Sequence, residues 1–514
     1  MKHHDNKSIL FRALCTAGVL LGAASGLQAQ VTGPSTSAAP YVVPSGAGVG
    51  YASFTSLRAV EDGTSKGLPQ MVGIPDGLGA YDNGNGTFTI LMNHELGNTA
   101  GNVRDHGARG SFVSQWVVDK ATLEVKSVTD LVKTVSLWSG AGFVETPAVA
   151  FARLCSADLP SQSAFQFGSF GTSAGIFMNG EESGAEARAF GHVATGPNAG
   201  KSYELPALGK FSWENSVANP LAQKNTIVAG LDDAGGGQVY FYLGEKKASG
   251  NDVEKAGLTG GNLFGLKISG LTTEVDSTSL AANATFTLAP LGNVTSKSGA
   301  TLQNESVANG VTGFQRPEDG AWNPANPKEF YFVTTDGAAS TDRSRLWRMT
   351  FDDLTNLELG GRAEMLLEGT EGQLMFDNFT ITPDGKRLLL QEDPGGNARL
   401  AKIWEYDIAT DGLREIAQHS PSLFATTASQ GNSKFGWDEE SSGIIPLWDI
   451  LGPGYYALDV QVHTASALSG AVENGQLLIM FTPVPEVTLP GTLGVGAVAI
   501  AGMMLRRRRS GTAA

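Results

Sequence analysis

Short hydrophobic runs bounded by turn residues recur along the chain between about residues 51 and 480. Residues 87–92, 238–243 and 329–334 alternate or cluster apolar and β-branched side chains, as half-buried or fully buried strands do. Each run follows a segment rich in Gly, Asn, Asp or Pro, and the Asn-Gly steps within 82–86 are typical of hairpin turns. Residues 380–390 read as a strand, a tight turn and a second strand.

Long stretches of helical periodicity are scarce in this region. The succession of hairpin, acidic turn and aromatic strand recurs at about the length of one propeller blade, although the units are too divergent to be counted. We therefore predict an all-β fold, with a β-propeller as the first interpretation and a β-sandwich array as the alternative. A propeller would bring loops from distant segments together around its central channel.

The N-terminus has the pattern of a secretory signal peptide. Lys2, Lys7 and Arg12 precede an apolar stretch, and residues 27–29 resemble a small-residue cleavage site. No twin-arginine pair is present, which favours a Sec-type route. We predict a signal peptide at 1–29, a Ser/Gly/Pro-rich linker at 30–50 and a folded body at 51–480.

The C-terminus predicts a sorting or membrane tail over residues 484–509. Val484-Pro485-Glu486 is followed by an apolar segment of about the length that crosses a bilayer, and then by four arginines. This order resembles the PEP-CTERM sorting tail, which implies an envelope sorting machinery as partner, although Val487 replaces a second proline. An ordinary stop-transfer anchor is the alternative. Either tail predicts a body that is periplasmic, on the outer surface or extracellular.

The mature body is strongly acidic. Of 36 bases, three lie in the predicted signal peptide and four in the tail, leaving 36 − 3 − 4 = 29; the acids number 51 − 1 − 1 = 49, so the net charge is −20. A body of this charge repels nucleic acid, which we exclude as a partner. The acidic surface either serves solubility or holds cations.

Several carboxylates are clustered in turns or at strand ends. Adjacent carboxylates repel one another unless they are solvated or bridged by a cation, and Ca²⁺ accepts six to eight oxygen ligands. The chain contains only seven histidines and no His-Glu-x-x-His motif, which leaves little material for an ordinary zinc site. The clusters are Asn93-His94-Glu95, Glu181-Glu182, Trp213-Glu214, Asp232-Asp233, Arg316-Pro317-Glu318-Asp319 and Glu392-Asp393.

Each cluster also has a purely structural interpretation. Asp232-Asp233 and Glu392-Asp393 precede glycines and are typical of turns. Glu181-Glu182 is consistent with the end of a strand. Cys155 is the only cysteine of the predicted mature chain, so it is either a buried packing residue or a metal thiolate. Arg316 is the most specific feature, because its guanidinium suits an oxyanion and a single proline separates it from Glu318.

These residues resemble the PhoX-type alkaline phosphatases. The matching segments follow the family order over about residues 70–465, nearly the whole mature body. They are residues 73–79, 87–95, 179–182, 209–214, 316–319 and 376–378.

The resemblance implies a β-propeller phosphomonoesterase that holds calcium and iron in one cluster. In that family, carboxylates from several loops and one cysteine bind the metals, and an arginine positions the phosphate. Carried onto this chain, Arg316 would be the phosphate clamp, and Cys155 would be the iron thiolate. The implied carboxylate ligands are Glu95, Glu181, Glu182, Glu214 and Glu318.

Two functions follow from these observations. The first is a secreted, metal-dependent phosphatase acting on phosphate esters. The second is a non-catalytic, calcium-stabilised propeller at the cell envelope, favoured by the tail and by Trp213, which stands where the family usually has a histidine.

Overall fold

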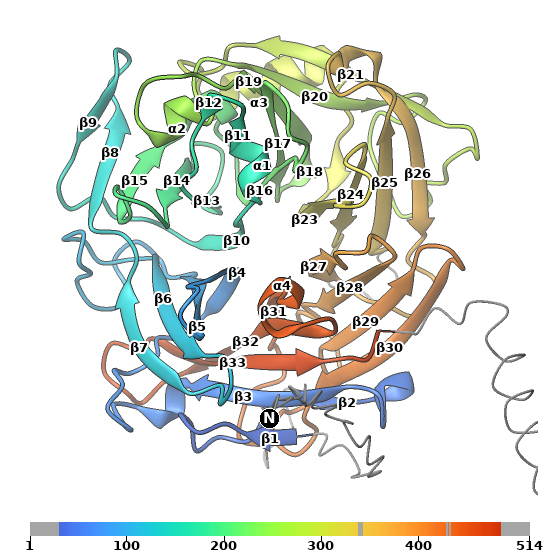
Figure 1. Cartoon of the computed structure of the whole chain (residues 1–514). Helices are drawn as coiled ribbons and strands as arrows, with labels where there is room; N and C mark the ends of the chain where they lie inside the picture. Colours follow the sequence, from blue (N-terminus) through green and yellow to red (C-terminus); the bar gives the residue numbers. More distant parts are fainter. Residues whose placement is uncertain (1–29, 338–342, 428–429, 431–432, 485–514) are drawn as a thin grey trace, which may run out of the picture.

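The computed structural model describes residues 30–337, 343–427, 430 and 433–484. Six blades, antiparallel except for the pairs β15–β8 and β3–β1, are arranged around a central axis, and the inner strand of each blade contacts the inner strand of the next (Figure 1). The inner strands are β4 (Pro75–Asp82), β10 (Leu154–Asp158), β16 (Trp213–Ala218), β23 (Pro317–Trp322), β27 (Phe376–Ile381) and β31 (Ser441–Pro446). The predicted β-propeller is therefore confirmed, and the β-sandwich array is not observed in the described residues.

The first three blades follow the chain order, apart from one pair of outer strands. Blade 1 continues from β4 with β5 (Thr87–His94), β6 (Phe112–Asp119) and β7 (Val125–Asp130). Blade 2 continues from β10 with β13 (Ile176–Glu181), β14 (Ala189–Val193), β15 (Lys201–Glu204), β8 (Thr134–Trp138) and β9 (Phe143–Glu145). Blade 3 continues from β16 with β17 (Asn225–Asp232), β19 (Val239–Glu245), β20 (Asn262–Ile268) and β21 (Thr285–Gly292).

Blades 3 and 4 form one sheet because β21 pairs with β26. Blade 4 continues from β23 with β24 (Glu329–Thr334), β25 (Arg345–Phe351) and β26 (Gly361–Leu367). Blade 5 continues from β27 with β28 (Arg387–Glu392), β29 (Lys402–Asp407), β30 (Gly412–His419) and β2 (Val42–Pro44). Blade 6 continues from β31 with β32 (Tyr455–Ala465), β33 (Glu473–Phe481), β3 (Ser53–Ala59) and β1 (Gln30–Thr32).

The helices and the small sheets lie in the connections between these strands. The helices are α1 (Gln162–Phe165), α2 (Asp252–Lys255), α3 (Gly299–Ala308) and α4 (Trp448–Leu451). The short 3₁₀ turns are η1 (Gly46–Gly48), η2 (Val60–Asp62), η3 (Pro206–Leu208) and η4 (Leu357–Leu359). Two-stranded sheets are formed by β11 (Gln166–Phe167) with β12 (Phe170–Gly171) and by β18 (Gly235–Gly237) with β22 (Phe314–Gln315).

The two ends of the body close the ring. β3 pairs with β33, so the N-terminal strand completes the blade that the C-terminal strands begin, and a closed ring protects the sheet edges. Residues 30–50, predicted as a linker, are packed onto the body, since β1 pairs with β3 and β2 pairs with β30. Their Ser/Gly/Pro composition suits edge strands as well as a linker.

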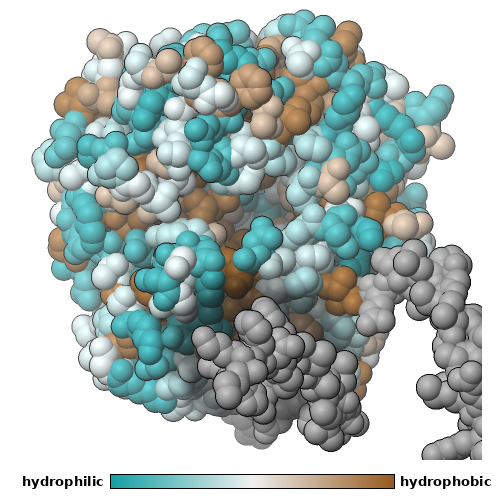
Figure 2. All heavy atoms as spheres, viewed as in Figure 1, coloured by the Kyte–Doolittle hydropathy of each residue, from teal (hydrophilic) through white to brown (hydrophobic). Residues whose placement is uncertain are grey.

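The predicted signal peptide and the apolar part of the predicted tail lie outside the described residues. Among the described residues, no helix is long and apolar enough to cross a membrane. Figure 2 shows one face on which hydrophilic and hydrophobic residues are intermixed. The large hydrophobic side chains exposed in the described part of the chain are scattered over many elements and form no single patch.

Close packing between blades fixes the inner strands against one another. Gly180 on β13 faces Trp213 at the start of β16, and a Cβ atom at Gly180 would lie 2.3 Å from the Trp213 Cβ. Trp213 is 1% exposed and stacks on Phe211 with ring centroids 3.9 Å apart. The start of β16 is thereby held against blade 2.

We expect Gly180→Ala to lower the free energy of unfolding by about 1–3 kcal/mol, because the added methyl overpacks this contact. Urea denaturation followed by circular dichroism measures the change. Gly142→Ala is the control, since a Cβ there meets nothing within 4 Å, and its effect is expected to stay within about 0.5 kcal/mol. Equal midpoints for the two variants would contradict this packing argument.

Candidate metal centre

All six blades share one local structure where the inner strand begins. The residue just before each inner strand is here called the entry position. Its carbonyl accepts a hydrogen bond from the backbone N–H of the residue opposite, which is here called the exit position. The N···O distances lie between 2.7 and 3.1 Å. The entry positions are Ile74, Arg153, Ser212, Arg316, Met375 and Glu440, and the exit positions are Glu95, Glu182, Asp233, Thr335, Asp393 and Gln461.

A β-bulge follows the first residue of the inner strand in five blades and the second residue in blade 6. A bulge inserts one extra residue and re-aims the side chains beside it. The second residue of each inner strand is here called the bulge position. The bulge positions are Asp76, Cys155, Glu214, Glu318, Asp377 and Ser442.

The residue after the bulge position joins neighbouring blades below this ring. Asn215 donates to Asp319 at 2.6 Å, and the Asn378 side chain donates to Ser156. Ser156 in turn donates to Glu214 at 2.5 Å. These bonds tie blades 2, 3, 4 and 5 together directly beneath the carboxylates and hold the starts of the inner strands in place.

Acidic side chains at the entry, bulge and exit positions converge at this end of the channel. Four overlapping groups each place three possible ligand atoms within 4.8 Å of one another. Neighbouring groups share Cys155, Glu214 and Asp377, so the ligand atoms form one continuous arc. The groups are Asp76–Glu95–Cys155, Cys155–Glu182–Glu214, Glu214–Glu318–Asp377 and Asp377–Asp393–Glu440.

Of the seven residues that the sequence singles out, the structure brings six together. Glu95, Cys155, Glu182, Glu214 and Glu318 belong to the arc, and Arg316 contacts Glu318 at 3.0 Å. Glu181 does not join them. Its carboxylate pairs with Arg188 at 2.6 Å and accepts the Ala152 N–H, because successive side chains of an extended chain point to opposite sides.

Five further carboxylates and one arginine of this centre are not among the seven site residues that the sequence predicts. Asp76 and Asp377 lie within segments that match the phosphatase family, and Asp233 and Asp393 lie in clusters interpreted as turns. Glu440 and Arg153 belong to no recognised motif. The missed residues can be found from the sequence only when the six blades are aligned, because they share positions in the strand register rather than one residue type. The missed residues are Asp76, Arg153, Asp233, Asp377, Asp393 and Glu440.

Burial and mutual repulsion raise the pKa values of these acids. Burial raises the pKa of Glu214 and of Glu440 to about 8, and burial together with the nearby Glu95 raises the pKa of Glu182 to about 10. The pKa values of Asp76, Glu318 and Asp377 lie well above their usual range, first because of burial and then because of neighbouring carboxylates. Each group therefore favours a proton or a cation at neutral pH.

The cysteine thiol lies inside the same arc. Cys155 is buried and approaches Asp76 with 3.3 Å between Sγ and Oδ2. Burial and the surrounding carboxylates raise the pKa of the thiol well above its usual range. A thiolate at this position would need a metal ion to stabilise it.

Among the described residues, two arginines form ion pairs with carboxylates of the arc. Arg316 donates from Nε and Nη2 to the two Asp233 oxygens at 2.8 and 2.9 Å, and Arg153 pairs with Glu95 at 2.5 Å and with Glu182. Their side chains are 37% and 49% exposed, whereas those of Asp233 and Glu318 are 5% and 3% exposed. The guanidinium groups therefore face the mouth of the channel and the carboxylates lie behind them.

The backbone at both arginines has a left-handed conformation. φ is +46° at Arg153 and +60° at Arg316, and the entry positions Ile74 and Met375 share this geometry. Such a conformation costs a non-glycine residue on the order of 1–3 kcal/mol. Its recurrence at four of the six entry positions ties it to the repeated bulge and to the placement of side chains at the channel mouth.

The donor set fits hard cations with one softer subsite. The eight carboxylates of the four groups and Asp233 outnumber the two paired arginines and the nearby His463, an excess of 9 − 3 = 6 negative charges if all are ionised. Carboxylate oxygens suit Ca²⁺, and one thiolate among carboxylates suits a transition metal such as iron. The residues present therefore fit a cluster of several cations.

Comparison of the whole fold with solved structures shows a likeness to PhoX. PhoX of Pseudomonas fluorescens, whose structure was determined in complex with vanadate, a transition state analogue, superposes with a TM-score of 0.59 at 10% identity over 84% of this chain and 95% of PhoX. The fold is PhoX-like. No family model matches this sequence, and no curated protein matches it.

Two other solved structures align with lower TM-scores. Sqt1 of Chaetomium thermophilum, bound to the N-terminus of ribosomal protein L10, covers 81% of this chain and 98% of its own at 8% identity, with a TM-score of 0.36. TolB of Acinetobacter baumannii covers 82% and 67% at 10% identity, with a TM-score of 0.32. The PhoX-like fold agrees with the family resemblance seen in the sequence.

Proposed function

We propose that this protein is a metal-dependent phosphomonoesterase that acts outside the cytoplasm. The observation that carries the proposal is the arc of four overlapping ligand groups with Arg316 and Arg153 at its mouth. Carboxylates alone would indicate cation binding. Exposed guanidinium groups directly above a cation cluster add a place for an anionic substrate.

We propose that calcium occupies the carboxylate groups and that iron is held at Cys155. The other ligands would be Asp76, Glu95, Glu182, Glu214, Glu318, Asp377, Asp393 and Glu440. When bound, the metals supply Lewis-acid neutralisation of phosphate oxygens and an activated oxygen nucleophile for in-line displacement.

The protein's own groups orient the ester. Arg316 is held by Asp233 through Nε and Nη2, which leaves Nη1 without a hydrogen-bond partner among the described residues. We propose that Nη1 donates to a phosphate oxygen. The support is geometric, since the side chain is partly exposed and its other nitrogens are fixed.

The test is hydrolysis of an aryl phosphate by purified protein loaded with calcium and iron. We expect turnover that is abolished by chelation and that exceeds the rate of a Glu318→Gln variant, because Glu318 lies in the arc and contacts Arg316. An aryl sulfate serves as the control substrate. Equal rates for the wild type and Glu318→Gln would refute the proposal.

A second candidate is a non-catalytic, calcium-stabilised propeller. It is favoured by the two-point pairing of Arg316 with Asp233, which occupies most of the guanidinium, and by Trp213 beside Glu214. In that case chelation lowers stability while no hydrolysis is detected with any metal.

The proposed location rests on the sequence. We propose a signal peptide at 1–29, a folded body that includes most of 51–480, and a sorting or membrane tail over 484–509. The partners would be a phosphate-ester substrate, the envelope sorting machinery and, through the tail, a membrane.

A further inference from the structure

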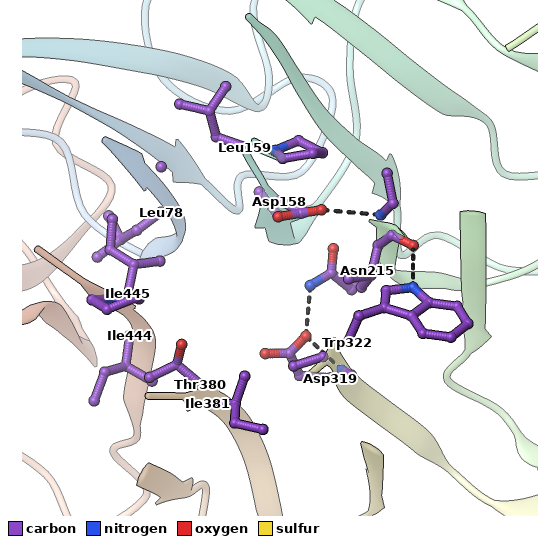
Figure 3. Close-up of a pocket in the computed structure, with 18 of the residues that line it drawn as sticks. Leu78, Asp158, Leu159, Asn215, Asp319, Trp322, Thr380, Ile381, Ile444 and Ile445 are labelled. Carbon is purple, nitrogen blue, oxygen red and sulfur yellow. Dashed lines mark hydrogen bonds between the residues drawn. The ribbon is translucent and has the colours of Figure 1, made fainter. Parts of the chain in front are cut away.

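A cavity lies at the end of the central channel opposite the metal centre. It has a volume of about 300 Å³ and is lined by the far ends of the inner strands, such as residues 78–80 of β4 and 444–446 of β31 (Figure 3). The inner strands begin at the metal centre, so the bulge residues separate the two sites. Asp319, whose neighbour Glu318 belongs to the arc, lines this cavity from the channel side.

The wall of this cavity is divided into a polar and an apolar side. Asp158, Asn215 and Asp319 come from blades 2, 3 and 4, while Leu78, Ile444 and Ile445 come from blades 1 and 6, and Figure 3 shows the two sets facing each other. Among the described residues that line the cavity, there is no Lys, Arg or His. The two carboxyl groups therefore have no cation of the protein beside them.

Asp158 and Asp319 differ in the number of hydrogen bonds that their carboxyl oxygens accept. Asp319 accepts through Oδ1 from Asn215 and from the Gly320 N–H, and through Oδ2 from the Phe379 N–H at 3.1 Å. Asp158 accepts one bond, from the Ala218 N–H to Oδ2 at 3.0 Å, and within the described chain Oδ1 has no partner. Asp158 is therefore the carboxyl group that can accept a further hydrogen bond.

The pKa of Asp158 agrees with a carboxyl group that has few hydrogen-bond partners. Burial raises the pKa of Asp158 to about 7, with a smaller contribution from the charge of Asp319. A carboxyl group in such surroundings gains from a cationic partner that replaces the lost water.

We propose that this cavity is a binding site for a small organic ammonium ion, with its charged end on Asp158 Oδ1 and its apolar body against Leu78, Ile444 and Ile445. A charge-assisted hydrogen bond to the free oxygen supplies orientation, and burial of the apolar body supplies affinity. The cavity volume matches a ligand with a single ring or a short alkyl chain. This site is independent of the proposed phosphatase activity.

The experiment is isothermal titration calorimetry of the calcium-loaded full chain with benzylammonium chloride, with benzyl alcohol as the neutral analogue. We expect benzylammonium to bind and benzyl alcohol to bind at least about tenfold more weakly, which is the usual effect of losing one charged hydrogen bond. Asp158→Asn should reduce benzylammonium affinity by a similar factor. Asp276→Asn, at an exposed aspartate away from the cavity, should leave it unchanged.

Two additional variants test whether benzylammonium binds in this cavity. Ala321→Leu fills part of the cavity and should weaken binding without changing any charge, and circular dichroism melting verifies that each variant is folded. Glu318→Gln should leave benzylammonium affinity unchanged, so that loss of phosphatase activity and loss of this site are distinguishable. Equal affinity of wild type and Asp158→Asn, or equal binding of the alcohol and the ammonium, would overturn the proposal.

Discussion

Chelation of the metals proposed for the arc is expected to lower the melting temperature of the protein by on the order of 10 °C at pH 8. The reason is the concentration of buried carboxylates in one arc, which repel one another once the cations are removed. Ligands that bind only the folded state contribute about 4 kcal/mol per site at a thousandfold excess over Kd. Differential scanning calorimetry with and without chelator measures the loss.

The pH dependence of the metal-free protein follows from the raised pKa values. Glu214 and Glu440 have pKa values of about 8 in the folded state against 4.5 for the ordinary side chain, so the folded state holds protons that the unfolded state has released. Stability from these groups is fully present below about pH 4.5. It is lost as the pH rises through about 8.

We therefore expect the melting temperature of the chelated protein to fall from pH 5 to pH 9. The metal-loaded protein should change less, because the cations replace the protons. Glu440→Gln removes one of the raised groups and should flatten the slope of the chelated protein. A melting temperature that rises with pH after chelation would contradict the proposed origin of the repulsion.

Replacement of Arg316 by glutamine is expected to reduce kcat/KM for an aryl phosphate by about 10²–10³-fold, the usual effect of removing one donor that stabilises developing charge. Asp233 and Glu318 hold the Arg316 guanidinium at the mouth of the centre, and Nη1 is its nitrogen without a partner in the described part of the chain. Steady-state kinetics measure the effect, and elemental analysis should show an unchanged calcium content.

Arg188→Gln is the matched control for this substitution. Arg188 also binds a glutamate through two nitrogens, at 2.7 and 2.6 Å from Glu181, but that pair is not part of the arc. Its loss should affect stability and leave kcat/KM within about threefold, since a side chain outside the arc does not contact the charge that develops on the phosphate. An equal loss of activity in both variants would indicate that Arg316 acts through folding alone.

The repeating strand pattern and the acidic excess are properties of the sequence by itself. Hydrophobic runs such as 87–92 and 329–334 become strands β5 and β24, which are buried along nearly their whole length, as short continuous apolar runs are in the core of a sheet. The motifs around Glu95, Glu214 and Glu318 predicted a cluster of carboxylates, and the structure brings these three residues into one arc. The family resemblance agreed in fold with the structural comparison.

Which carboxylates meet was decided by the tertiary structure. Glu181 and Glu182 are adjacent in the sequence, yet extended geometry sends one to Arg188 and the other into the arc. Asp393 and Asp233 resemble turn residues until the strand register places them at the exit positions of their blades. Glu440 ends the acidic run 438–440, which the sequence analysis did not single out, and its place before β31 brings it beside Asp377.

The sequence reveals the strands but not the arc because strands form through local interactions and the arc forms through long-range ones. Hydrophobic periodicity is local and can be read within one strand, whereas the arc depends on the closure of six blades and on a bulge repeated in each. A bulge shifts the register by one residue and leaves no fixed residue type behind. The sequence therefore determined that this protein is an acidic, repetitive β structure, and the closed ring determined which of its acids act together.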